Sequence, residues 1–163
     1  MTAGATYVPI ATQTLGSNSS AVTFSSIPQT YTDLVLVCYA ICSASATNDI
    51  GITFNGDTGS NYSRTTMQGN GSSPYSGRNT NVNVGYGVFF SQYGVQATVN
   101  IMNYSNTNTY KTFLIRSGQA ADSTQAAVDL WRNTSAITSV TLTAMAYQIA
   151  TGSTFTLYGI ASA

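Results

Sequence analysis

The sequence contains no histidine and no glutamate, and Lys111 is its only lysine. Charged residues make up 6% of the 163 positions, against about 25% in most soluble domains. Without an imidazole the chain cannot build a Ser-His-Asp or Cys-His catalytic group. Zinc sites that use histidine are excluded as well, and two cysteines cannot complete a four-thiolate site. We therefore expect a structural or binding protein that is not an enzyme and has no metal and no cofactor.

The low charge also argues against nucleic acid and membrane partners. The formal net charge is zero, and five scattered cations cannot form a stripe that neutralises phosphates. No stretch approaches the ~20 apolar residues of a membrane span. The start of the chain, residues 1–5, lacks the basic and apolar segments of a signal peptide, so we expect folding in a reducing cytoplasm. Cys38 and Cys42 would lie too far apart on one strand for a disulfide, and we expect two buried thiols.

Apolar and polar residues alternate with a period of two along most of the chain. The segments that show this pattern or are rich in strand-forming residues are 22–24, 50–54, 82–90, 95–104, 110–117, 127–132, 139–146 and 155–157. This pattern predicts an all-β fold: a single antiparallel β-sandwich, a jelly roll, of about eight to ten strands. Only residues 119–127 are a helix candidate, and a weak one. We expect one domain over residues 1–163, with an N-terminal extension at about 1–10 and a long polar loop at about 58–80 that contains one short strand around 64–67.

The segment 34–42 departs from the alternation, because both of its faces are apolar. The second face consists of Val35, Val37, Tyr39 and Ile41. An antiparallel sandwich usually leaves one face of each sheet in solvent, so this face needs a cover. The cover is either a local extra layer of the chain or a neighbouring subunit. These four residues are therefore the candidate oligomer interface.

Tyrosines and arginines near predicted loops are the candidate residues for binding a ligand or partner. Tyr62, Tyr75 and Tyr93 lie in or beside loops, and tyrosine suits both sugar stacking and protein interfaces. Arg64 and Arg78 fall in the predicted polar loop. In a chain with so few charges, we expect each arginine to have a specific Asp or backbone partner, within the chain or across an interface.

Two groups of side chains with oxygen atoms allow a chemical interpretation that we rank below a structural one. Asp49, Asn55 and Asp57 cluster around Asn55-Gly56 and offer oxygen ligands for Ca²⁺, but Asn-Gly after an alternating strand predicts first of all a tight turn. Asp122 and Asp129 could form a pair for glycoside cleavage. Their flanking residues carry no further sign of catalysis, so we expect none.

Segments along nearly the whole chain resemble a class of small virion structural proteins of tailed bacteriophages. The segments are 10–15, 22–28, 31–36, 54–62, 103–106, 110–112, 130–132, 137–142 and 152–160, and the most characteristic is the ending Phe-Thr-Leu-Tyr-Gly-Ile at 155–160. The resemblance implies a jelly-roll-like sandwich on the virion surface, often a homotrimer, assembled in the bacterial host cytoplasm. It implies no catalytic residues.

The resemblance leaves two roles open. In the first, the protein decorates or cements the capsid, with further copies of itself and the major capsid protein or other virion proteins as partners. In the second, it is a host-attachment module on the tail or a fibre, and binds cell-surface glycan through loop tyrosines. The chain is short and has no collagen-like or coiled-coil stalk, which favours capsid decoration.

Overall fold

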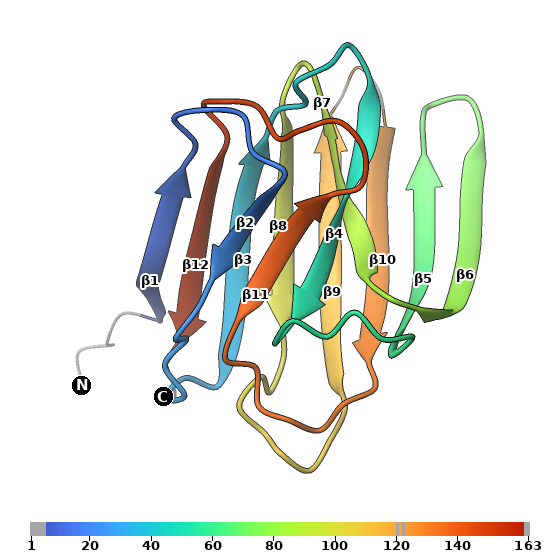
Figure 1. Ribbon diagram of the computed structural model, residues 1–163. Coiled ribbons are helices and arrows are strands. Elements are labelled where there is room, and N and C mark those ends of the chain that lie inside the picture. The colour runs from blue at the N-terminus through green and yellow to red at the C-terminus, as the bar shows by residue number, and fades with distance from the viewer. Residues whose placement is uncertain (1–5, 120, 122, 162–163) are drawn as a thin grey trace.

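The computed structural model describes residues 6–119, 121 and 123–161. In this part of the chain, twelve strands form two antiparallel sheets that pack face to face, and there is no helix (Figure 1). The predicted all-β sandwich is therefore confirmed. The strands are β1 (Tyr7–Thr14), β2 (Ala21–Phe24), β3 (Asp33–Ala40), β4 (Thr47–Phe54), β5 (Tyr62–Gly69), β6 (Pro74–Val82), β7 (Gly85–Ser91), β8 (Val95–Ile101), β9 (Lys111–Gln119), β10 (Ser123–Trp131), β11 (Val140–Ala144) and β12 (Thr154–Ile160).

The strand order is that of a jelly roll with two insertions. The larger sheet has the order β1-β12-β3-β8-β9-β10-β5-β6, and the smaller sheet has the order β2-β11-β4-β7. Without the hairpins β5–β6 and β9–β10, each sheet has four strands, and successive strands alternate between the sheets except at β4 and β7, as in a jelly roll. Both hairpins extend the larger sheet at the same side. The observed twelve strands therefore exceed the predicted eight to ten.

The core lies between the two sheets and follows the alternation of the strands. On β12, Phe155 and Leu157 are fully buried, while their neighbours in the strand are half-buried. An aromatic cluster fills the end of the core near β5 and β10. There the ring centroids of Phe54 and Phe113 lie 4.9 Å apart in an edge-to-face contact, and Tyr62 stacks on Trp131 at 6.4 Å. Such contacts stabilise the packing beyond the area that they bury.

The predicted long loop at 58–80 is wrong, because most of it forms the hairpin β5–β6. β5 pairs with β10 along its whole length, from Tyr62 opposite Trp131 to Gly69 opposite Thr124. β6 is the edge strand, and seven of its nine residues are exposed. A strand that is exposed on both faces has no apolar alternation, so its Gly, Ser and Asn residues suggest a loop. Backbone pairing with β5 holds it in the sheet.

Three other predicted boundaries also differ. Residues 7–10 belong to β1, which pairs with β12, so the predicted N-terminal extension is wrong for them; residues 1–5 lie outside the described residues. The helix candidate at 119–127 is wrong, because β10 begins at Ser123 and pairs on both sides, which overrides the helical propensity of alanine. The predicted strand at 82–90 is interrupted at residues 83–84, where the chain crosses from the larger to the smaller sheet.

The Asn55-Gly56 turn is confirmed, and Asn55 does more than reverse the chain. Asn55 and Gly56 have φ values of 53° and 69°, and the Asp57 N–H donates to the Phe54 carbonyl at 2.9 Å. Asn55 Oδ1 accepts from the backbone N–H groups of Thr138 at 2.8 Å and Ser139 at 3.1 Å. This side chain therefore ties the β4–β5 turn to the segment that precedes β11.

We expect Asn55→Ala to lower the free energy of unfolding by about 2 kcal/mol. The substitution leaves two backbone N–H groups without their acceptor and puts a less tolerant residue at positive φ. Chemical denaturation measures the change. Gln92→Ala, at an exposed position, serves as control and should change stability by less than about 0.5 kcal/mol. Equal stability of the two variants would contradict the role assigned to Asn55.

Candidate functional site

The outer face of the larger sheet is not covered by the described part of the chain. On β3, the side chains of Val37 and Tyr39 are 43% and 41% exposed. The sequence left two possible covers open, an extra layer of the chain or a neighbouring subunit. In the described ranges, no extra layer of the chain lies over Val37 and Tyr39. We call Val37 and Tyr39 the β3 patch. The Tyr39 ring lies against Gly94, where a Cβ atom would come within 2.4 Å of the tyrosine hydroxyl and would displace the ring, and the φ of 77° at Gly94 also favours glycine.

The other two residues of the predicted interface are less accessible. Val35 is only 6% exposed, although it lies on the same face of β3. Ile41 is half-buried, and its backbone N–H donates to Ser153 Oγ at 2.9 Å, at the start of β12. The structure therefore leaves Val37 and Tyr39 as the parts of the predicted interface that another molecule can bury.

A second apolar area on the same outer face lies across β9, β10 and β5. Leu114 of β9 is directly opposite Val128 of β10, and two residues along, Ala126 of β10 is opposite both Arg116 of β9 and Met67 of β5. We call these five residues the Arg116 groove. They line a hollow of about 330 Å³. Sequence analysis missed it, because its members come from three strands, and each strand alone shows only ordinary alternation.

A polar stripe separates the two apolar areas. The outward-facing residues of β8 are Gln96, Thr98 and Asn100, and they lie between β3 and β9 in the sheet. Arg116 is exposed and is directly opposite Thr98, at the side of the groove next to this stripe. The outer face therefore offers two separate apolar contacts rather than one continuous patch.

The three candidate tyrosines do not form one site. Tyr62 is fully buried; its hydroxyl donates to the Asp57 carbonyl at 3.2 Å and accepts from the Phe54 N–H at 3.0 Å. The prediction that Tyr62 contacts a ligand or partner is therefore wrong, since loop composition around it concealed a core strand. Tyr75 and Tyr93 are 55% and 70% exposed, on β6 and in the β7–β8 turn.

The two candidate arginines have different surroundings. Arg64 lies on the inner face of β5, where its Nη2 donates to Asn79 Oδ1 at 3.3 Å and its guanidinium carbon is 5.0 Å from the centroid of the Tyr86 ring. The partners of Arg64 are thus within the chain, but they are an amide side chain and an aromatic ring and not the expected Asp or backbone group. Arg78 lies on the exposed edge strand β6. It has no hydrogen bond or ion pair with any described residue.

Asp129 of β10 is a fully buried carboxylate, and the sequence pattern did not predict its burial. Oδ2 accepts from the Tyr86 N–H at 2.8 Å, whereas Oδ1 has no hydrogen-bond partner. The β7 backbone can lie this close because residue 85 is glycine, where a Cβ atom would come within 2.9 Å of Oδ2. Burial raises the pKa of Asp129 to about 7, against the opposing effects of the Tyr86 hydrogen bond and of Arg64.

The burial of Asp129 bears on the glycosidase alternative. Asp122 lies outside the described residues, and Asp129 has no exposed surface with which to contact a substrate. A pair of catalytic carboxylates needs both groups at the substrate. The described structure therefore offers no exposed Asp129 for this alternative, and the expectation that the chain is not an enzyme stays a prediction.

The described residues also bear on metal binding, membrane spans and thiols. They contain no group of three or more His, Cys, Asp or Glu side chains placed to hold a metal ion, and none of their segments is a helix able to span a membrane. Cys38 and Cys42 are buried free thiols, as predicted, and burial raises the pKa of Cys38. Asp57 accepts from Trp131 Nε1 at 2.7 Å and from Asn61 Nδ2 at 2.8 Å. These contacts pin the loop after β4 to β10.

Comparison with known proteins gives no family: no protein-family model matches the chain, and neither does any curated protein.

We expect Asp129→Asn to remove most of a decline in stability between pH 4 and pH 7. The pKa of Asp129 is near 3.8 in the unfolded chain and about 7 in the fold, so the folded state binds more protons in this range and stability falls as the pH rises. The difference corresponds to roughly 4 kcal/mol. Denaturation at a series of pH values measures the slope. Asp49, which burial also shifts upward, leaves a remaining slope of the same sign.

Asp57→Asn is the matched control with the opposite sign. Burial raises the pKa of Asp57, but hydrogen bonds from Trp131, Asn61 and the Gly59 N–H outweigh it and hold the pKa below its usual value. Its stabilisation is thus present above pH 4 and is lost as the pH falls. At pH 7, Asp57→Asn should be less stable than wild type, whereas Asp129→Asn should be more stable. Equal pH slopes in wild type and Asp129→Asn would contradict the assignment.

Proposed function

We propose that the chain is a non-enzymatic structural protein of a bacteriophage virion, and that it decorates or cements the capsid surface. The observation that carries the proposal is the open outer face of the larger sheet, with two apolar areas on a nearly uncharged jelly roll. Exposed apolar residues that lie next to one another mark interaction surfaces. The resemblance to small virion proteins of tailed phages supports the same role.

The chemistry of the charged residues also supports a role without catalysis. Lys111 is fully buried and donates to the carbonyl groups of Thr109 at 2.8 Å and Thr134 at 3.0 Å, while burial lowers its pKa. Asp57 and Asp129 are held by the hydrogen bonds described above. These groups hold loops and strands together.

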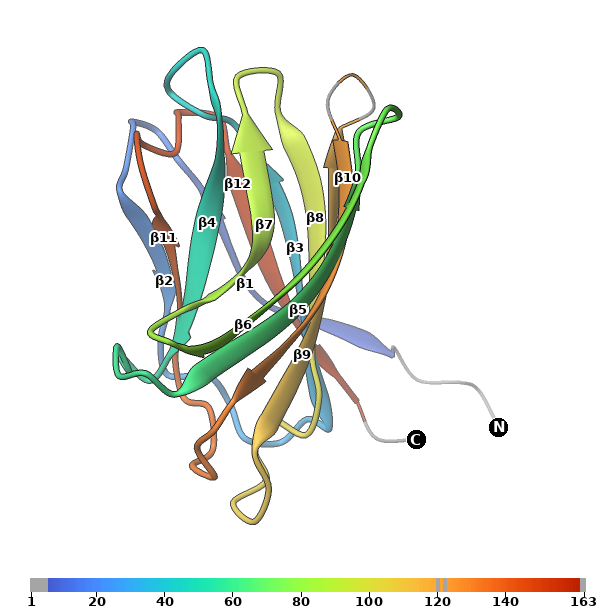
Figure 2. The same ribbon diagram turned by 90° about the vertical axis from the view of Figure 1, so that its right-hand side faces the viewer.

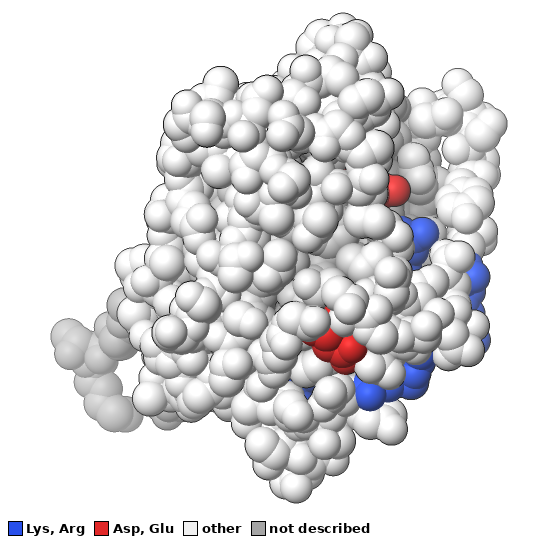
Figure 3. Space-filling model, in the orientation of Figure 1, with Lys and Arg blue, Asp and Glu red and all other residues white. Residues whose placement is uncertain are grey.

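The proposed assembly on the virion is a homotrimer, with the β3 patch at the contact between subunits. In a closed ring each subunit repeats the same contact, so the burial of Val37 and Tyr39 is gained three times. On the face that Figure 3 shows, charged atoms are sparse and gather toward β5 and β6, and β2 and β11 have no charged residue. A surface with little charge offers little electrostatic resistance to close packing.

The second candidate role is host attachment at the tail or a fibre. It is favoured by Tyr75 and Tyr93, which are exposed at the same end of the sandwich, where β5 meets β6 and β7 meets β8 (Figure 1). Exposed tyrosines suit stacking on sugar rings. Because Tyr62 is buried, only two of the three tyrosines proposed to contact glycan, Tyr75 and Tyr93, remain available for this role.

The copy number of the protein in purified virions distinguishes the two roles. A capsid repeats each contact by symmetry, so we expect on the order of hundreds of copies per particle by quantitative mass spectrometry. A count of about six to a few dozen would assign the protein to the tail or fibre instead. Absence from the particles would overturn the proposed function altogether.

We expect Val37→Asp to dissociate the trimer. A carboxylate buried in an apolar contact without a partner costs several kcal/mol at each of the three contacts. Analytical ultracentrifugation at micromolar concentration should find a trimer for wild type and a monomer for the variant. Thr23→Asp, on the exposed face of β2, is the control and should remain trimeric. If the wild type is a monomer in this experiment, the free protein is not a stable trimer, and a trimer would form only on the virion.

A further inference from the structure

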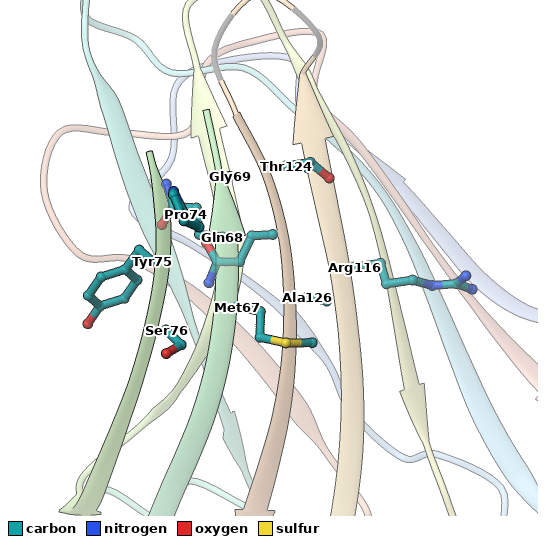
Figure 4. Close-up of a pocket in the computed structure, with 10 residues that line it drawn as sticks. Met67, Gln68, Gly69, Pro74, Tyr75, Ser76, Arg116, Thr124 and Ala126 are labelled. Carbon is teal, nitrogen blue, oxygen red and sulfur yellow. The ribbon is translucent and has the colours of Figure 1, made fainter. Parts of the chain in front are cut away.

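The Arg116 groove is a larger hollow than its five residues alone suggest. A second cavity of about 560 Å³ shares Met67, Arg116 and Ala126 with the first and extends toward the start of β6. In Figure 4 the Met67 side chain extends across β10 toward Ala126, and the Arg116 side chain extends away from both. A third hollow of about 220 Å³ lies on the other side of Arg116, next to Val37. Arg116 thus stands among three depressions of one face.

Large apolar side chains are exposed to solvent around this arginine. Met67, Leu114 and Val128 are 66%, 37% and 48% exposed, and the strand register makes them neighbours rather than scattered residues. A partner that covers them gains roughly 25 cal/mol for each Å² of apolar surface removed from water. The groove therefore favours an occupant with apolar side chains.

The charge of the face defines the occupant further. Arg116 makes no hydrogen bond or ion pair with any residue that the structure describes, and the same holds for Arg78, which lies on β6 of the same sheet. The carboxylates of the described residues lie elsewhere: in the core, on the smaller sheet, at the start of β3 and in the loop after β4 (Asp129, Asp49, Asp33 and Asp57). The groove is thus apolar with unpaired positive charge at its side.

This charge pattern disfavours a second copy of the chain as the occupant. A twofold face-to-face contact places the same surface on both sides, so arginines would meet arginines without a carboxylate between them. A carboxylate from a different protein would instead form a charge-assisted, bidentate pair with the Arg116 guanidinium. Charge complementarity therefore favours an acidic partner.

We propose that the Arg116 groove docks a segment of another virion protein that carries apolar side chains and a carboxylate, which pairs with Arg116. The apolar side chains fill the hollow between Met67, Leu114 and Val128. This inference depends on the proposed virion function and adds the surface and the chemistry by which the protein attaches to the particle. It leaves the β3 patch to the contacts between copies.

A photo-crosslinking amino acid at position 128 tests which molecule occupies the groove. Benzoylphenylalanine replaces Val128 in one variant and Thr23, on the exposed face of β2, in the control; both are incorporated into virions before irradiation. We expect position 128 to form an adduct with a different virion protein, and mass spectrometry of the adduct should find acidic and apolar residues at the site. Adducts with another copy of the chain alone, or no adduct from position 128, would overturn the proposed docking.

Charge reversal at position 116 tests the role of Arg116 in attachment to the virion. Arg116→Glu should lower incorporation at least tenfold in competition with the unmodified protein, Arg116→Lys should retain most of it, and Thr23→Glu should match wild type. Because Arg116 has no partner in the described chain, the variants should unfold at the same temperature. Equal incorporation of Arg116→Glu and wild type would overturn the pairing, while absence of the wild-type protein from virions would instead overturn the proposed function itself.

Discussion

The unequal width of the two sheets governs the rest of this structure. Four strands face a sheet of eight, so the smaller sheet covers only part of the inner face of the larger one (Figure 2). β7 is its last strand, and it packs over β10, β9 and β8 with a smaller contact to β5. Beyond it, β6 has hardly any cover, and on the outer face of the large sheet Val37, Tyr39, Met67 and Val128 stay exposed.

The edge of the smaller sheet is also where the interior becomes polar. Beneath β7, the Asp129 carboxylate lies opposite Arg64 in the neighbouring strand, yet each group keeps one polar atom without a partner. An apolar pair would pack there without this cost, since buried polar groups stabilise only when they are fully hydrogen-bonded. The aromatic cluster of Phe54, Tyr62 and Trp131 lies next to this region and supplies the apolar contacts that hold β4 on β5 and β10.

Local pattern predicted well those elements that bury one face. The alternation of Phe155 and Leu157, the Asn55-Gly56 turn and the buried thiols of Cys38 and Cys42 all follow from residues close in sequence. Prediction failed where burial was absent or where pairing within the sheet overrode local propensity. β6 is exposed and has no apolar signal, and β10 is held by a strand on each side, which overrides the propensity of its alanines. Tyr62 was predicted in or beside a loop because residues typical of loops surround it, although it is a core residue.

The sequence by itself determined the β class, the absence of imidazole chemistry and the two-faced apolar segment that becomes β3, because these depend on composition and on a period of two. Only the tertiary structure decided that Val37 and Tyr39 stay open while Val35 is buried. It also brought Met67, Leu114 and Val128 together around Arg116, from strands that join in the sheet but lie up to about sixty residues apart in the chain. Strand register sets such neighbours, and register depends on pairing between distant segments, which no local pattern specifies.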